Sequence, residues 1–136
     1  MNQDILAKLK GAANKAVLNR SILDVALDGT WIHRKNSLGQ WIEYDNRFLS
    51  IFGYESAEEY EAQGGWSGNI NQEDLRTALE LMAQHEQSKG AIPYTLYVRY
   101  THKDGHELKV LCRGKIIEWN PDGSYKTFVG SHTLLP

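Results

Sequence analysis

The C-terminal third of the chain constrains its fold most strongly, because three strand-like segments follow one another there with only tight turns between them. The segments span residues 94–102, 107–119 and 125–134. An Asp-Gly pair lies in each of the two intervening turns, and Asp-Gly tolerates the positive φ angles that a hairpin turn requires. Strands joined by such turns pair antiparallel with their neighbours in the chain. Gly114, in the middle segment, marks a bulge or a close packing contact.

The preceding residues supply shorter elements. Aromatic segments at 30–35 and 40–44 flank a polar, glycine-containing turn and predict a second hairpin. A short helix is expected at 47–52, where Gly53 provides a typical C-terminal stop. A second short helix is expected after Ser56, whose hydroxyl can cap it. We therefore expect two more strands and two short helices before the longest helix.

The longest expected helix spans 72–88. Asn71 occupies the capping position, and Asp74 follows three residues later as in a variant of the capping box. Apolar residues recur on one face with helical periodicity: Leu75, Ala78, Leu79, Met82 and Ala83. Together with the strands, these helices predict an α+β fold, a five-stranded antiparallel sheet with helices on one face.

An amphipathic helical pattern also occupies the N-terminus, over residues 4–20. Its apolar face is thin and rich in alanine, and includes Ile5, Leu9, Ala12 and Ala16. Such a helix needs a surface to pack on. It either packs on its own domain or pairs with a second copy of the chain. We expect residues 1–20 to be this docking or dimerisation helix and residues 21–136 to form a single domain.

Composition and charge exclude several classes of protein. The chain has 136 residues with 41% hydrophobic and 24% charged residues, enough to bury a core as one domain. Residues 43–86 contain ten acidic residues and two arginines, so this segment would repel a phosphate backbone, and we expect no nucleic-acid partner. No apolar run is long enough to cross a membrane, and Cys112 has no second cysteine to pair with. We expect a cytoplasmic protein with no membrane partner.

The residues of these elements resemble the PAS domain family, specifically its PAS_3-like subclass with a C-terminal PAC motif. The resemblance covers residues 29–133 and is carried by the following residues: Gly29-Thr30-Trp31; Asn46-Arg47-Phe48 with Phe52-Gly53-Tyr54 and Glu58-Glu59; Trp66 through Asp74; and Arg99, Lys103-Asp104-Gly105, Gly114, Asp122-Gly123 and Gly130-Ser131-His132-Thr133. Asn71 and Gln72 replace a histidine and a proline that are common in the family. Leu134-Leu135-Pro136 stands where an Asp-Ile-Thr tripeptide usually couples the sensor to its downstream helix.

The resemblance implies that the domain binds something between its sheet and its helices, or pairs with another copy. From the residues we expect an apolar pocket lined by Phe48, Met82, Leu96 and Val98, with Arg99 or Tyr44 as polar contacts. Such a pocket suits a small organic ligand with one anionic or hydroxyl group. Strand alternation leaves the inward face open, so Leu96 and Val98 could exchange places with Tyr97 and Arg99.

The sequence gives little support for a flavin, haem or metal cofactor. Cys112 lies within a strand and is expected to be a small buried hydrophobe, not a flavin-reactive thiol. His85 lies near the end of the long helix and is expected to face solvent instead of ligating haem. His102 and His106 straddle a turn, where side chains seldom converge, and no further residue offers metal-ligand spacing. We expect no haem, flavin adduct or metal, and the ligand itself is left unnamed.

These observations predict a PAS-like sensory or interaction domain of a bacterial signal-transduction protein. It would bind a small ligand or a signalling partner protein, pass on a conformational shift and form a homodimer. No nucleophile elbow, phosphate-binding loop or zinc-protease helix is found, so we expect no enzyme activity. Two alternatives stay open: a ligand-free dimerisation module, and a small curved-sheet isomerase or hydratase. The PAS-like pattern leaves no room for an output domain, so the chain is expected to be an input module, whether it stands alone or forms part of a longer protein.

Overall fold

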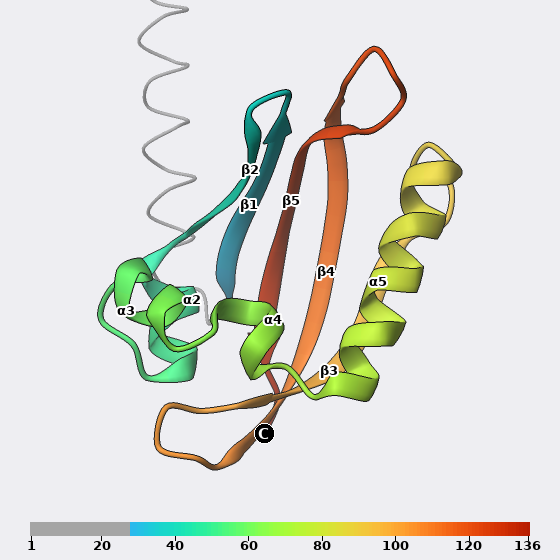
Figure 1. The fold of residues 1–136 in the computed structure, drawn as a ribbon. Coiled ribbons are helices and arrows are strands. Elements are labelled where there is room, and N and C mark those ends of the chain that lie inside the picture. Colours follow the sequence, from blue (N-terminus) through green and yellow to red (C-terminus); the bar gives the residue numbers. More distant parts are fainter. Residues whose placement is uncertain (1–27) are drawn as a thin grey trace, which may run out of the picture.

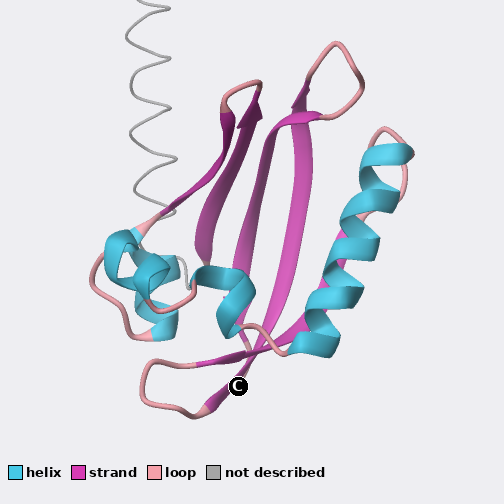
Figure 2. Cartoon of the chain, viewed as in Figure 1, coloured by secondary structure: helices cyan, strands magenta, loops and turns pink. Residues whose placement is uncertain are grey.

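The computed structural model describes residues 28–136 and contains one five-stranded antiparallel sheet. The strands lie in the order β2-β1-β5-β4-β3, so the N-terminal hairpin packs beside the last strand of the C-terminal meander. Figures 1 and 2 show the long α5 in front of β3 and beside β4, with α2 and α3 beside the β1–β2 hairpin. The predicted α+β fold with a five-stranded antiparallel sheet is confirmed. The strands are β1 (Gly29–Asn36), β2 (Gly39–Tyr44), β3 (Tyr94–Thr101), β4 (Glu107–Trp119) and β5 (Tyr125–Leu134).

Two glycines in the centre of the sheet make room for an indole ring. Gly114 of β4 and Gly130 of β5 are register partners. A Cβ atom on Gly130 would lie 2.2 Å from Cζ2 of Trp31, and one on Gly114 would lie 2.5 Å from the Phe128 ring. Of the two alternatives open for Gly114, close packing is therefore correct, while the irregularity of β4 falls later, between Ile116 and Trp119.

The two short helices begin and end at residues whose side chains or backbone suit those positions. Helix α2 (Asn46–Phe52) starts at Asp45, whose carboxylate accepts a hydrogen bond from the backbone N–H of Phe48 at 2.8 Å. It ends at Gly53, which has φ 86° and the left-handed conformation that favours glycine. Helix α3 (Ala57–Ala62) begins at Ser56 as predicted, because the serine hydroxyl accepts from the Glu59 N–H. A further short helix, α4 (Gly65–Asn69), precedes the long one.

Helix α5 (Gln72–Gln87) begins at Asn71, whose side chain accepts hydrogen bonds from two backbone N–H groups of the first turn. Asp74 does not complete a capping box, because its carboxylate binds β3 instead. The predicted apolar face is partly wrong: Leu79 is 50% exposed and Ala83 is exposed, whereas Ala78 and His85 are buried. Relative to the predicted face, the helix is thus rotated so that His85 contacts the sheet. The His85 side chain forms a hydrogen bond there.

The core lies between the inward face of the sheet and helices α2 to α5. On β3 the even-numbered residues point inward, and Val98 and Tyr100 are 3% and 2% exposed. Tyr97 points to the opposite face and is 72% exposed. The inward face that alternation left open is therefore the one that carries Leu96 and Val98. Trp31 and Phe52 belong to the core, as predicted.

The expected N-terminal helix over residues 4–20, with its face of Ile5, Leu9, Ala12 and Ala16, lies outside the described residues. Within residues 28–136, none of the helices combines the length and the apolar character that crossing a membrane would require.

Candidate functional site

A small cavity lies between the sheet and the helices. Its volume is about 40 Å³, and strands β1 to β5 contribute to its wall together with α2, α4 and α5. Most of the lining is aromatic or aliphatic. Its polar side-chain atoms come mainly from these residues: Trp31, His33, Tyr44, Tyr94, Tyr100 and His132. A cavity of this size holds a few water molecules or a small group, but not a drug-sized molecule, unless the wall moves.

A larger groove of about 580 Å³ lies next to the cavity, between the β1–β2 hairpin and helices α4 and α5. The cavity and the groove share four lining residues: His33, Ile42, Trp66 and Met82. These four side chains form the boundary between the two spaces. The groove also has polar walls, including Gln40 and Glu61, while the cavity is mostly apolar.

Four of the six residues predicted from the sequence line this cavity, namely Tyr44, Phe48, Met82 and Val98. Leu96 is half-buried and packs against the core, but it does not line the cavity. Arg99 does not line it either. Leu96 lies between Tyr94 and Val98, which do line the cavity, but its side chain packs into the surrounding core instead. Arg99 has an odd number, whereas the even-numbered residues of β3 point inward.

Arg99 instead ties β3 to the start of α5. Its guanidinium donates to both carboxylate oxygens of Asp74 at 2.9 Å and to Asn71 Oδ1 at 3.2 Å, and its backbone N–H donates to Asp74 Oδ2 at 2.8 Å. The hydrogen bonds from Arg99 hold the pKa of Asp74 below its usual value. The guanidinium is therefore occupied as a structural link and is not a polar contact for a ligand in the cavity.

Tyr44 lies in the cavity wall with its ring stacked on Phe48, at 4.7 Å between ring centroids. Its hydroxyl donates a hydrogen bond to Glu61 Oε1 at 2.6 Å. Burial raises the pKa of Tyr44, and the neighbouring Glu61 carboxylate adds to the effect. The hydroxyl thus stays protonated and joins β2 to α3 at the edge of the groove.

Two histidines in the cavity wall were not identified by the sequence analysis. His132 is 4% exposed, its Nε2 lies 3.0 Å from the Tyr100 hydroxyl, and burial lowers its pKa to about 3. His33 is 9% exposed, its Nε2 lies 3.2 Å from the Tyr125 hydroxyl, and burial lowers its pKa as well. Both are neutral near pH 7. For His33, the alternation Trp31-x-His33 on one strand could have indicated a side chain that points inward beside Trp31.

Two polar atoms of the cavity-lining residues have no hydrogen-bond partner among the described residues. They are Nε1 of Trp31 and Nδ1 of His132, both fully shielded from solvent. Buried polar groups without partners carry a cost of about 1–3 kcal/mol each. A bound molecule that satisfied them would recover part of this cost.

The buried thiol and the long-helix histidine have structural roles. Cys112 lies in the cavity wall, and burial raises its pKa to about 12, so it behaves as the small buried hydrophobe that was predicted. The prediction that His85 faces solvent is wrong, because it is 3% exposed. Its Nδ1 lies 2.7 Å from the carbonyl of Ile92, and its Nε2 accepts from the N–H of Ile116 at 3.2 Å. Both ring nitrogens are therefore engaged in fixing α5 to the sheet.

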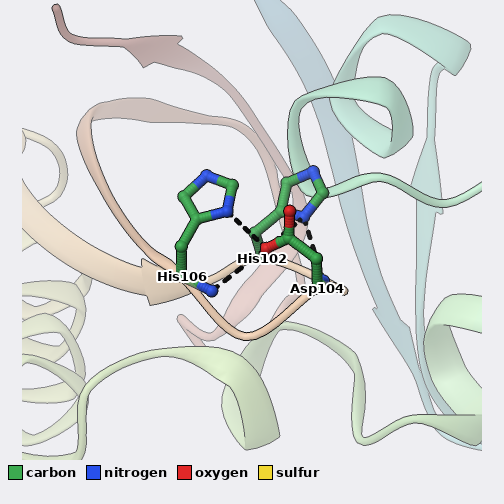
Figure 3. Close-up of side chains that lie close together, drawn as sticks. All are labelled: His102, Asp104 and His106. Atoms are coloured by element: carbon green, nitrogen blue, oxygen red, sulfur yellow. Dashed lines mark hydrogen bonds and ion pairs between the residues drawn. The ribbon is translucent and has the colours of Figure 1, made fainter.

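The expectation that His102 and His106 do not converge is also wrong. Their rings are stacked with centroids 4.5 Å apart, and the Asp104 carboxylate lies against both Nδ1 atoms (Figure 3). The turn between β3 and β4 thus gathers two imidazoles and a carboxylate at the surface, away from the cavity.

Several solved structures align with most of this chain, and some of them are parts of sensor proteins. A sensory box histidine kinase/response regulator from Burkholderia thailandensis aligns with a TM-score of 0.67 at 20% identity, over 85% of this chain and 82% of that one. A PAS domain from Colwellia psychrerythraea aligns with a TM-score of 0.62 at 15% identity, over 88% and 97%. A light-oxygen-voltage domain studied with a flavin analogue aligns with a TM-score of 0.59 at 14% identity, over 85% and 83%.

Sequence comparison gives the family directly. A search of curated proteins finds no significant relative. The family model of the PAS fold, PAS_3, matches residues 42–132, which is about two thirds of the chain. This match begins at the second strand and ends at His132 in the last one, so it includes the helices and the meander that enclose the cavity. The chain therefore belongs to the PAS fold family.

Proposed function

We propose that this chain is a cytoplasmic sensory domain of a bacterial signal-transduction protein, and that it binds a small organic ligand between its sheet and its helices. One observation carries the proposal. The cavity is mostly apolar, yet it is flanked by two shielded polar atoms, Nε1 of Trp31 and Nδ1 of His132, that have no hydrogen-bond partner within residues 28–136. A ligand with an apolar body and one hydroxyl or carbonyl oxygen fits both properties.

The small size of the cavity supplies a means of relaying a signal. Its volume of about 40 Å³ is well below the roughly 300 Å³ of the smallest common ligand pockets. A ligand must therefore displace the side chains between cavity and groove, chiefly Trp66 of α4 and Met82 of α5. Binding would favour a state with these helices moved outward, which a partner protein can recognise.

The acid–base alternative fits the cavity less well. An isomerase or hydratase needs a base whose pKa lies near the working pH. His132 is the more deeply buried of the two histidines in the wall, and its pKa of about 3 makes it a weak base at neutral pH. The geometry thus favours binding over turnover.

Mass spectrometry of the freshly purified full chain tests the ligand proposal. We expect the native mass to exceed the denatured mass by one small molecule. Met82→Trp would fill the boundary between cavity and groove and abolish this difference. Ile117→Trp adds the same side chain on the opposite face of the sheet, where Ile117 is 54% exposed, and should retain the bound mass. A bare native mass, also after incubation with the cell extract, would contradict the proposal.

Homodimer formation is a second candidate function, favoured by exposed apolar residues on the outer face of the sheet. Tyr97 of β3 and Ile117 of β4 are 72% and 54% exposed. Sedimentation of the full chain should show a dimer that Tyr97→Lys weakens, and removal of residues 1–20 should lower the dimer fraction. A fully dimeric product in both cases would exclude this surface and this segment as the interface.

A further inference from the structure

The turn between β3 and β4 brings its two histidines to the same side. The N–H of His102 donates to the carbonyl of His106 at 2.8 Å, which closes the turn at its base. Gly105 provides the positive φ, 101°, that the tight reversal requires. As a result, the two imidazole rings lie nearly parallel, 21° apart in plane angle, with their Nδ1 atoms toward the tip of the turn (Figure 3).

The carboxylate of Asp104 lies against both rings. Its Oδ1 is 3.1 Å from Nδ1 of His102 and forms a short hydrogen bond with Nδ1 of His106. It also accepts the backbone N–H of His106 at 3.1 Å, which holds the carboxylate in this position. One ligand atom from each residue falls within 4.8 Å of the others.

We propose that His102, Asp104 and His106 form a surface binding site for a divalent transition-metal ion. Two imidazole nitrogens and one carboxylate oxygen are a donor set that suits Zn²⁺, Ni²⁺, Co²⁺ or Cu²⁺, while Mg²⁺ and Ca²⁺ prefer oxygen donors alone. Ligands at about 2.0–2.1 Å from zinc lie roughly 3 Å from one another. The 3.1 Å between Asp104 Oδ1 and His102 Nδ1 already matches this spacing.

Ion binding requires two adjustments within the turn. The backbone N–H of Asp104 donates to Nδ1 of His102 at 3.1 Å and must release that nitrogen. The metal takes the place of the proton between His106 and Asp104, and the His106 ring turns so that the ion lies in its plane. The His106 side chain is 55% exposed and has room to rotate. Water would complete the coordination, because the site is open to solvent.

The His102 side of the site is held in place by the body of the domain. The His102 ring packs on Gly53, where a Cβ atom would lie 2.5 Å from Cε1. The intervening Lys103 donates its N–H to the carbonyl of Phe52 at 2.9 Å, and its ammonium pairs with Glu59 at 3.0 Å. These contacts anchor the turn on the α2–α3 corner, so a bound ion would fasten an already positioned loop.

Calorimetric titration of the untagged full chain with ZnCl₂, and separately with NiCl₂, tests the proposal. We expect one ion per chain. His106→Ala and Asp104→Asn should each weaken binding at least tenfold, because each removes a ligand, and even partners behind the ligands are worth about 10–100-fold. Asp122→Asn, at the tip of the other hairpin, removes an exposed carboxylate with no histidine beside it and should change nothing.

Imidazole ¹⁵N spectra provide a second readout that does not depend on heat of binding. Substoichiometric zinc should shift the ring nitrogens of His102 and His106 and leave those of buried His85 and His132 in place. The proposal is overturned if millimolar zinc does not bind, if the Asp122→Asn control weakens binding as much as Asp104→Asn, or if the shifts fall on other histidines. Circular dichroism of each variant establishes that the fold is retained.

Discussion

Two regions on the helix side of the sheet contain similar apolar and aromatic residues but differ in how completely they are filled. One is the closed cluster, formed by Leu49, Phe52, Tyr54 and Tyr60, all 0–6% exposed. The other is the open side, formed by His33, Ile42, Trp66 and Met82, which separates the cavity from the groove. None of the closed-cluster residues lines either space.

The difference follows from how each region is enclosed. The closed cluster is bounded by α2, α3 and the β3–β4 turn. Its ring centroids lie at distances typical of packed aromatic pairs, such as 5.1 Å between Tyr54 and Tyr60. The open side is bounded by the edge strand β2 and the very short α4. Stability and ligand access are thus assigned to different residues, so substitutions should separate them.

The largest expected effect concerns the closed cluster. Phe52 has no exposed surface, so Phe52→Ala leaves a cavity and should lower the free energy of unfolding by about 3–5 kcal/mol. Urea denaturation followed by circular dichroism measures this loss. Leu38→Ala removes a side chain that is 94% exposed and should change stability by less than about 0.5 kcal/mol. If Phe52→Ala lowered the free energy of unfolding no more than Leu38→Ala does, the cluster would not be closed.

The next largest loss of stability is expected at Gly130, which packs against the Trp31 ring. In Gly130→Ala the new Cβ would lie 2.2 Å from the indole and 2.4 Å from the carbonyl oxygen of Arg113, and backbone cannot yield as a flexible side chain does. We expect a loss of about 1–3 kcal/mol in the same denaturation assay. Gly68→Ala is the matched control, because no atom lies within 4 Å of its added Cβ, and it should be neutral or slightly stabilising. Equal effects of the two substitutions would contradict the packing of Trp31 on this glycine.

Local sequence patterns predicted most of the strands and helices that enclose the two regions. The hairpin turns, the strand alternation and the helix ends at Gly53, Ser56 and Asn71 depend on residues within a few positions of one another. The PAS resemblance supplied the place of the pocket, between the sheet and the helices, but not how nearly full the pocket is.

The errors concern side chains whose partners lie far along the chain. Arg99 is engaged by Asp74, 25 residues away, and His85 is buried because Ile116, 31 residues away, donates to it. His132 of β5 lies next to Tyr100 of β3, across the intervening strand β4. Periodicity assigns a residue to a face of its own element, but it does not say which polar group the neighbouring element presents there.

The buried His132, which lines the cavity, predicts that the stability of the fold depends on pH. Its pKa is about 3 in the folded chain and near 6.5 when unfolded, so the unfolded state binds more protons as the pH falls below 6.5. Stability should therefore drop by about 2 kcal/mol between pH 7 and pH 5, where most carboxylates are still ionised. Urea titrations at several pH values measure the slope. His132→Phe should flatten most of it and leave the smaller share of His33, whose pKa is also lowered; an unchanged slope would place the titrating group elsewhere.

The smallest expected effect concerns the open side, and it is the sharpest test of the division. Met82 is only half-buried, so Met82→Ala should cost no more than about 1 kcal/mol, a fraction of the loss at Phe52. The same substitution joins the cavity to the groove, since Met82 lines both. Binding of a small apolar probe such as indole, followed by shifts of backbone amides in α5 and β1, should therefore strengthen while stability is nearly unchanged. A loss of stability as large as that of Phe52→Ala, without stronger binding, would mean that the open side is as much a part of the packed core as the closed cluster.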